Sequence, residues 1–220
     1  MKSAARKIAS ALMAVSMVFV LFGCGNSGAG DKEKFIGTWN AKVDMTELFN
    51  DNFQQGMGES GVDLADYFNI DRFELTMIFT FNEDGTYSIV VDEGLLSNTF
   101  ENVKSDLKDG MTSYFEDMIA AEGVDMSLDE MLDYLGTTLD ELIDESIGDD
   151  LYDEIAEEFA VSGKWDAANG KLYMTESVSE DIDKNTYDLY EITSGGIKLS
   201  EPEGVEDDMG IFPLLLTKIG

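Results

Sequence analysis

Carboxylate and amide side chains at alternate positions near residue 180 form a pattern that suggests chemistry. Asp181, Asp183 and Asn185 have the spacing of the first, third and fifth ligands of an EF-hand calcium loop. The pattern then fails, because Thr186 occupies the glycine position and Ile192 the position of the bidentate glutamate. We interpret the segment as a polar turn before a strand. We expect no metal site and no cofactor, and leave weak binding of divalent cations open.

The residue types also restrict catalysis. The chain has no histidine, the usual proton shuttle and metal ligand, and Cys24 is its single cysteine. Its 46 acidic residues place carboxylate pairs throughout the sequence by chance. A carboxylate-dependent extracellular hydrolase is therefore the least favoured alternative, and we expect the protein not to be an enzyme.

The first 23 residues have the layout of a secretory signal peptide. Three basic residues among the first seven precede an apolar run from Ile8 to Phe22. As a helix this run would span about 22 Å, which is shorter than the hydrocarbon core of a bilayer at roughly 30 Å. We therefore predict that residues 1–23 are a signal peptide rather than a permanent membrane span.

Leu21, Phe22, Gly23 and Cys24 resemble the lipobox of bacterial lipoproteins. The resemblance implies that the thiol of Cys24 receives a diacylglyceryl group and that the chain is cut just before it. Two acyl chains give a stable anchor where one is marginal. A disulfide would need a second cysteine and a metal site would need clustered ligands, so both alternatives for Cys24 are weak. We expect an extracytoplasmic protein, lipid-anchored at a bacterial membrane or cell surface.

Residues 24–34 are predicted to be the lipidated cysteine and a flexible linker, and residues 35–220 the folded domain. The chain carries 46 acidic against 14 basic residues, a formal net charge of −32. Such a surface repels nucleic acid, so we expect no nucleic-acid partner. We interpret the charge as a solvated surface, with attraction of divalent cations or of a basic partner as the alternative.

Period-two alternation predicts β-strands at both ends of the folded part. The clearest strand, residues 72–81, places on one face Phe73, Leu75, Met77, Phe79 and Phe81. A turn at residues 82–85 leads into a strand at 86–92 that contains Tyr87. Other strands are expected at 35–45, 161–165, 171–175, 187–192, 196–199 and 212–219. About eight antiparallel strands are enough to close a small barrel.

The segment at about 95–159 breaks this alternation and predicts a helical insertion. Apolar residues between Leu96 and Met118 step by three and four, as on one face of a helix. Two capping boxes predict the starts of two short helices; they are Ser127 with Glu130, and Thr138 with Glu141. A last helix is expected from Asp149, and another short one from Thr46. The fold class is therefore α+β: mainly an antiparallel β-barrel or strongly curved sheet, with a helical insertion.

Gly37 and Trp39, at the opening of the first strand, resemble the first motif of lipocalin and other calycin barrels. Later pieces at 79–87 and 163–165, together with the final strand, resemble lipocalin-like domains of bacterial lipoproteins. The resemblance covers roughly residues 35–92 and 161–220. It implies that Trp39 packs across the barrel floor beneath a basic side chain of a late strand, for which Lys218 is the candidate. An ordinary core tryptophan is the alternative.

The barrel interior is the remaining candidate site. Its expected lining is Phe73, Met77, Phe79, Phe81 and Tyr87, and the bulk of these side chains favours a filled core over a cavity. Two hypotheses stay open. One is a lipid-anchored lipocalin-like binding or interaction protein, whose partner is a small apolar ligand or an envelope protein. The other is a structural cell-envelope protein with a filled barrel and no small ligand.

Overall fold

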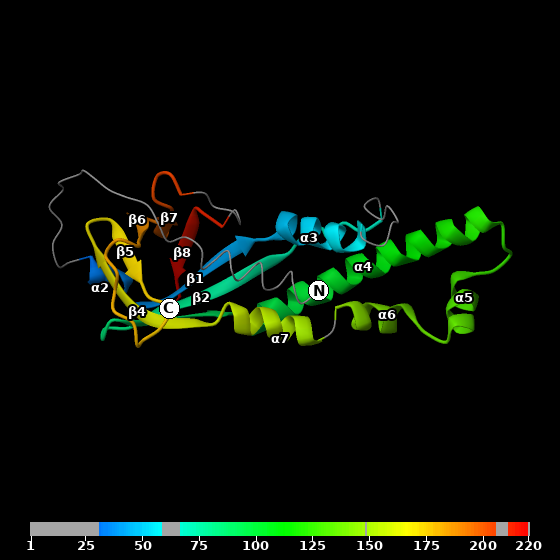
Figure 1. The fold of residues 1–220 in the computed structure, drawn as a ribbon, viewed down its shortest axis with the longest axis horizontal. Coiled ribbons are helices and arrows are strands. Elements are labelled where there is room, and N and C mark those ends of the chain that lie inside the picture. Colours follow the sequence, from blue (N-terminus) through cyan, green and yellow to red (C-terminus); the bar gives the residue numbers. More distant parts are fainter. Residues whose placement is uncertain (1–30, 59–66, 148, 206–210, 220) are drawn as a thin grey trace. The chain divides into compact units, whose positions relative to one another are not determined.

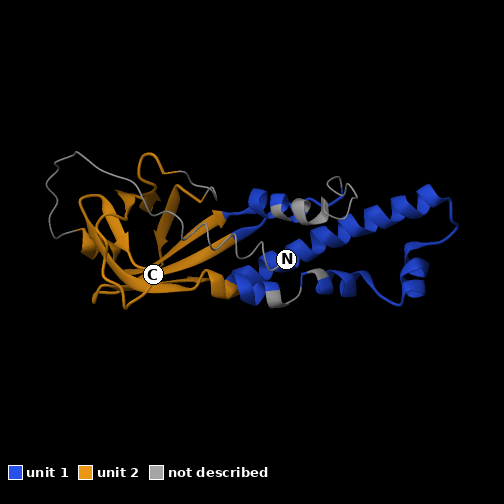
Figure 2. Cartoon of the chain, viewed as in Figure 1, with its two compact units in different colours: residues 1, 44–74, 94–155 blue, residues 2–43, 75–93, 156–220 orange. Residues whose placement is uncertain are grey.

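The computed structural model describes residues 31–58, 67–147, 149–205 and 211–219. They form two compact units (Figure 2). The barrel unit contains the described residues up to 43, together with 75–93 and those from 156 onwards. The helical unit contains the described residues of 44–74 and 94–155. The predicted signal peptide, lipobox and Cys24 lie outside the described residues and stay predictions.

Eight antiparallel strands close into a barrel in sequence order (Figure 1). The strands are β1 (Gly37–Asp44), β2 (Glu74–Phe81), β3 (Thr86–Val91), β4 (Val161–Ala168), β5 (Lys171–Met174), β6 (Asp188–Thr193), β7 (Gly196–Ser200) and β8 (Leu214–Lys218). The last strand pairs back onto the first, with Trp39 opposite Lys218 and Asn40 opposite Thr217. The predicted fold class, an α+β barrel of eight strands with a helical insertion, is confirmed.

The tight turns of the barrel follow their sequence signals. Gly85 ends the β2–β3 turn with a φ of 86°, a left-handed conformation that glycine adopts without steric cost. The β4–β5 turn is shorter than predicted, because β4 continues to Ala168. Asn169 and Gly170 alone turn the chain, with φ values of 57° and 76°. Two consecutive left-handed residues of this kind form the type I′ turn that suits a two-residue hairpin.

The helices are α2 (Lys32–Phe35), α3 (Thr46–Gly58), α4 (Glu93–Glu122), α5 (Leu128–Leu135), α6 (Leu139–Ser146) and α7 (Asp149–Glu158). The last four form the predicted insertion, and α4 buries the apolar residues Leu96, Phe100, Val103 and Leu107. Both predicted capping boxes are present, at Ser127 for α5 and at Thr138 for α6. Across the described residues, no helix combines the length and the apolar character that crossing a membrane requires.

The start of the folded part differs from the prediction. We expected a flexible linker up to Lys34 and a strand from Phe35, but Lys32–Phe35 form the short helix α2 and the first strand begins at Gly37. Phe35 is fully buried in the barrel unit, and the ammonium of Lys32 lies 5.0 Å from the centre of the Trp165 ring. Because residues 32–35 have no alternating pattern of their own, these tertiary contacts are what hold them in place.

Candidate functional site

The barrel interior contains a cluster of aromatic rings in direct contact, centred on Phe35. The centre of this ring lies 5.4 Å from that of Phe81, 5.7 Å from that of Trp165 and 4.8 Å from that of Tyr190. Phe81 and Trp165 also meet edge to face at 4.9 Å. Edge-to-face rings at such distances attract each other beyond the gain from burying their area. Four aromatic side chains from α2, β2, β4 and β6 therefore fill this part of the interior.

Hydrogen bonds hold Phe35 in place within the cluster. The indole N–H of Trp39 donates to the carbonyl oxygen of Phe35 at 2.6 Å. The indole N–H of Trp165 donates to the carbonyl oxygen of Asn82 at 3.2 Å. Lys34 pairs with Asp31 at 2.8 Å, and this pairing holds the pKa of Asp31 below its usual value. The segment from Asp31 to Phe35 thus forms an ordered plug in the barrel unit.

Four of the five predicted lining residues belong to the barrel unit and are buried: Met77, Phe79, Phe81 and Tyr87. Phe81 stacks against Phe79 and Tyr87, with 6.3 Å between ring centres in both pairs. The hydroxyl of Tyr87 donates to the carbonyl oxygen of Thr175 at 2.7 Å. Burial raises the pKa of Tyr87, and so do the charges of Glu176, Asp188 and Glu180. These side chains pack together, as the filled-core interpretation expects.

The placement of Phe73 in the barrel lining was wrong. Phe73 precedes β2 and belongs to the helical unit, where its ring stacks on that of Phe49 at 4.6 Å and meets that of Phe100 edge to face at 6.1 Å. Its backbone N–H donates to the hydroxyl oxygen of Thr46 at 2.8 Å. The alternation of apolar residues continues across the unit boundary, so it could not show that Phe73 packs elsewhere.

The tryptophan motif of the first strand has a clear geometry. Lys218 pairs with Trp39 across β1 and β8, and its ammonium lies 5.2 Å from the centre of the indole ring. The same ammonium donates to the carbonyl oxygen of Ile36 at 3.2 Å. Gly37 has a φ of 126°, and a Cβ at this position would lie 3.1 Å from the Cε of Lys218. The φ favours glycine where the lysine crosses to the tryptophan, and the contact of Lys218 with Trp39 is the pairing that the lipocalin resemblance implied.

Sequence reasoning missed a pair of carboxylates beside the hairpin of β6 and β7. Leu189 pairs with Ser200 in this hairpin, so the next positions outward, Asp188 and Glu201, face each other. Burial and the charge of Glu201 raise the pKa of Asp188 to about 6. Asp188 and Glu201 are equally far from the hairpin turn in the sequence, and this spacing was the signal that could have identified the pair. Structural carboxylate pairs perturb pKa values in the same way as catalytic ones, so we give this pair no catalytic role.

The segment of the calcium-like pattern is a turn whose side chains bond locally. The carboxylate of Asp183 accepts bonds from the backbone N–H and the side-chain amide of Asn185, at 2.9 and 2.8 Å. Asp181 lies 3.8 Å from the ammonium of Lys164. Within the described ranges, no three acidic or cysteine side chains are grouped in a way that could hold a metal ion.

A second candidate surface lies on the helical unit, at the end of α4 and along α5. Five large apolar side chains are exposed there: Met118 (38%), Val124 (51%), Met126 (37%), Tyr134 (85%) and Leu135 (60%). We call residues 118–135 the helical tip. The sequence did not mark Tyr134 and Leu135 as exposed, because α5 carries the pattern of an ordinary amphipathic helix.

No family model, curated protein or solved structure matches the chain.

Proposed function

We propose that the protein is a lipid-anchored, extracytoplasmic, lipocalin-like interaction protein whose barrel is a packed scaffold rather than a ligand cup. One observation carries this proposal: the ring of Phe35 is fully buried against Phe81, Trp165 and Tyr190. An eight-stranded barrel is only wide enough for its own side chains or for one small ligand. A plug of the chain's own aromatic rings takes the space that an apolar ligand would need. The contacts with a partner are then made on the outside.

The anchor is supported by the lipobox-like residues ending at Cys24 and by the position of the plug. Asp31 is only seven residues beyond Cys24, so the acyl chains would hold the barrel unit close to the membrane surface. Metabolic labelling with a tagged fatty acid tests the anchor. We expect label on the wild type and none on Cys24→Ser, while the control Ser27→Ala labels like the wild type. Unchanged labelling of Cys24→Ser would overturn the anchor.

Titration with a fluorescent polyene fatty acid tests the packed scaffold. Trp39 and Trp165 are the two tryptophans of the chain, and both lie buried in the barrel unit. A ligand in the interior would therefore receive energy from them. We expect no saturable transfer in the wild type. Saturable transfer that is lost in Trp165→Phe would mean that the interior binds an apolar ligand, and would overturn the scaffold.

A further inference from the structure

The acidic charge of the helical unit is concentrated beyond two lysines of α4. Lys104 pairs with Asp144 at 2.7 Å, and Lys108 pairs with Asp140 at 2.6 Å, which ties α4 to α6. From residue 109 to residue 163 the chain has 18 acidic residues and no lysine or arginine. The helical tip lies wholly within this stretch. Its electrostatic potential is therefore strongly negative, and it attracts cations over about a Debye length.

The apolar side chains of the helical tip are displayed on a well-formed helix. The hydroxyl of Ser127 accepts from the backbone N–H of Glu130 at 3.2 Å, and the Glu130 carboxylate accepts from the backbone N–H of Ser127 at 2.8 Å. The bond from the Ser127 backbone N–H, followed by one that the Ser127 hydroxyl donates to the same carboxylate at 3.0 Å, holds the pKa of Glu130 below its usual value. Gly136 ends the helix in the left-handed conformation that helix C-termini favour. Tyr134 and Leu135 are therefore presented by a capped turn of helix.

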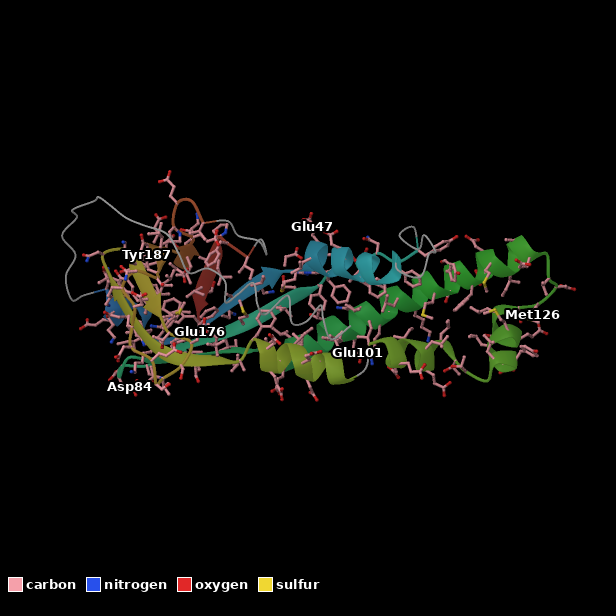
Figure 3. The ribbon with its side chains drawn as sticks, in the orientation of Figure 1. Glu47, Asp84, Glu101, Met126, Glu176 and Tyr187 are labelled. Carbon is pink, nitrogen blue, oxygen red and sulfur yellow. The ribbon has the colours of Figure 1, made fainter. Side chains whose placement is uncertain are left out.

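Methionines add adaptability to this surface. Met126 lies in the connection between α4 and α5, at the end of the helical unit (Figure 3), and Met118 is in the last turns of α4. Flexible thioether side chains fit partners of differing shape, and tyrosine supplies a large contact area at low entropic cost. The helical tip thus exposes a tyrosine, a leucine and two methionines among acidic residues, which we call its acidic surround.

The negative charge of the helical tip indicates which kind of partner can bind there. A second copy of a chain with net charge −32 is repelled, and so is an anionic membrane. A small apolar ligand would gain nothing from the acidic surround. A cationic amphipathic helix would place its apolar face on Tyr134 and Leu135 and its basic residues against the neighbouring carboxylates. We propose that the helical tip binds a cationic amphipathic helix of a partner protein. This inference rests on the proposed interaction function and names the class of partner.

A synthetic peptide tests the inference directly. The probe is an 18-residue helix with leucines on one face and lysines on the other, and the comparison peptide has the same composition in scrambled order. The full chain, purified as cells produce it, is immobilised through a C-terminal tag, and binding is followed by surface plasmon resonance. We expect the patterned peptide to bind at least about tenfold more tightly than the scrambled one. Its association rate should fall steeply as salt rises.

Matched variants assign the binding to the helical tip. Replacing Tyr134 and Leu135 together by serine should weaken the patterned peptide about tenfold or more, because few central side chains carry most of an interface's energy. The control is Val178→Ser, since Val178 is 53% exposed but belongs to the barrel unit. Neutralising Asp129 and Asp133 by asparagine should lower the association rate about threefold. The matched change Glu203→Gln in the barrel unit should leave the rate unchanged.

Several results would overturn the inference. They are absence of binding, equal binding of patterned and scrambled peptides, or an equal loss in the Val178 variant. A wild-type dimer that dissociates in the Tyr134/Leu135 variant would make the tip an interface between copies instead. Fatty-acid labelling at Cys24 and the polyene titration do not involve the helical tip. If Cys24 is labelled and the polyene shows no saturable transfer, but the patterned peptide does not bind, only the class of partner is wrong. The proposed function then stands.

Discussion

Both units of this protein contain packed aromatic rings, but they differ in what their lysines contact. In the barrel unit, aromatic rings fill the interior and four lysines lie against aromatic rings: Lys32 on Trp165, Lys171 on Tyr187, Lys184 on Tyr173 and Lys218 on Trp39. In the helical unit, capping boxes start α5 and α6, and two ion pairs tie α4 to α6. The aromatic rings of the barrel interior pack against partners within the barrel unit, whereas a tyrosine and a leucine of the helical tip are exposed to solvent.

We relate this difference to the proposed roles of the two regions, a scaffold for the barrel unit and a contact surface for the helical tip. A lysine over an aromatic ring neutralises part of the acidic surface and covers apolar area at the same time. Beyond Lys108 the helical unit has no lysine that could cover apolar area in this way, because residues 109–163 contain no lysine or arginine. A partner with both positive charge and apolar surface would neutralise acidic residues of the helical tip and cover its apolar side chains. Lysines have these two effects within the barrel unit. Changes in the barrel unit should therefore affect stability, and changes at the helical tip should affect binding.

The largest effect is expected from removal of the plug. Phe35→Ala should lower the free energy of unfolding by about 3–5 kcal/mol, because it deletes a fully buried ring that touches three other rings. Urea unfolding followed by tryptophan fluorescence measures the change, since both tryptophans lie in the barrel unit. Phe49→Ala in the helical unit is the control and should leave the tryptophan transition nearly unchanged. A loss below about 1 kcal/mol for Phe35→Ala would mean that the plug contributes little to the barrel.

A close backbone contact inside the helical unit should be nearly as sensitive. A Cβ on Gly110 of α4 would lie 2.3 Å from the carbonyl oxygen of Tyr67, so Gly110→Ala must push the helix and residue 67 apart. We expect a loss of about 2–3 kcal/mol, although alanine in an open helical site is favourable by about 1 kcal/mol. Urea unfolding followed by circular dichroism measures it. Ser105→Ala, at an exposed position of the same helix, should be neutral or slightly stabilising. A stabilised Gly110→Ala protein would contradict the contact.

The pair of Asp188 and Glu201 predicts a pH-dependent effect in the barrel unit. Because the folded state raises the pKa of Asp188 to about 6, folding favours its protonated form, and its ionisation destabilises the barrel as pH rises through the window from about 4 to 6. Asp188→Asn should therefore stabilise the protein by about 1–2 kcal/mol at pH 7, and the gain should vanish below about pH 4. Urea unfolding across this range measures both. Glu203→Gln should show no such window, and a pH-independent gain for Asp188→Asn would refute the raised pKa.

The smallest effect concerns the helix caps. The hydroxyl of Thr138 accepts from the backbone N–H of Glu141 at 3.2 Å, and Thr138→Ala removes this bond at the start of α6. The expected loss is about 1 kcal/mol, confined to the helical unit. Amide hydrogen exchange should show faster exchange in α6 and an unchanged barrel. Thr112→Ala within α4 is the matched control and should leave the exchange of α6 as it is.

Local signals predicted much of this fold. Alternation located the strands, residues 82–85 marked the turn between β2 and β3, and both capping boxes marked true helix starts. These features depend on neighbours within a few residues, so they can be read without knowing the tertiary structure. The contact of Lys218 with Trp39 came from the resemblance to lipocalins instead, because it joins the two ends of the domain.

Long-range packing explains what the sequence did not reveal. A four-residue helix shows no periodicity, so the sequence does not distinguish α2 from a linker or Phe35 from the start of a strand. Phe73 continues the alternation of β2 yet packs on Phe49, and nothing local marks that change of unit. Among the 46 acidic residues, Asp188 and Glu201 could be paired only through the register of β6 and β7. The predicted lipobox lies outside the described residues, and its test is chemical.

Native mass spectrometry of the chain purified from the cells that produce it, compared with its denatured mass, tests the central claim most directly. Covalent acyl chains add to both masses, whereas a ligand held in the barrel adds only to the native one. A packed scaffold predicts equal native and denatured masses for the wild type. A reproducible excess of native mass that disappears on denaturation would contradict the account, because it would show a small molecule bound where Phe35 and its aromatic neighbours are packed.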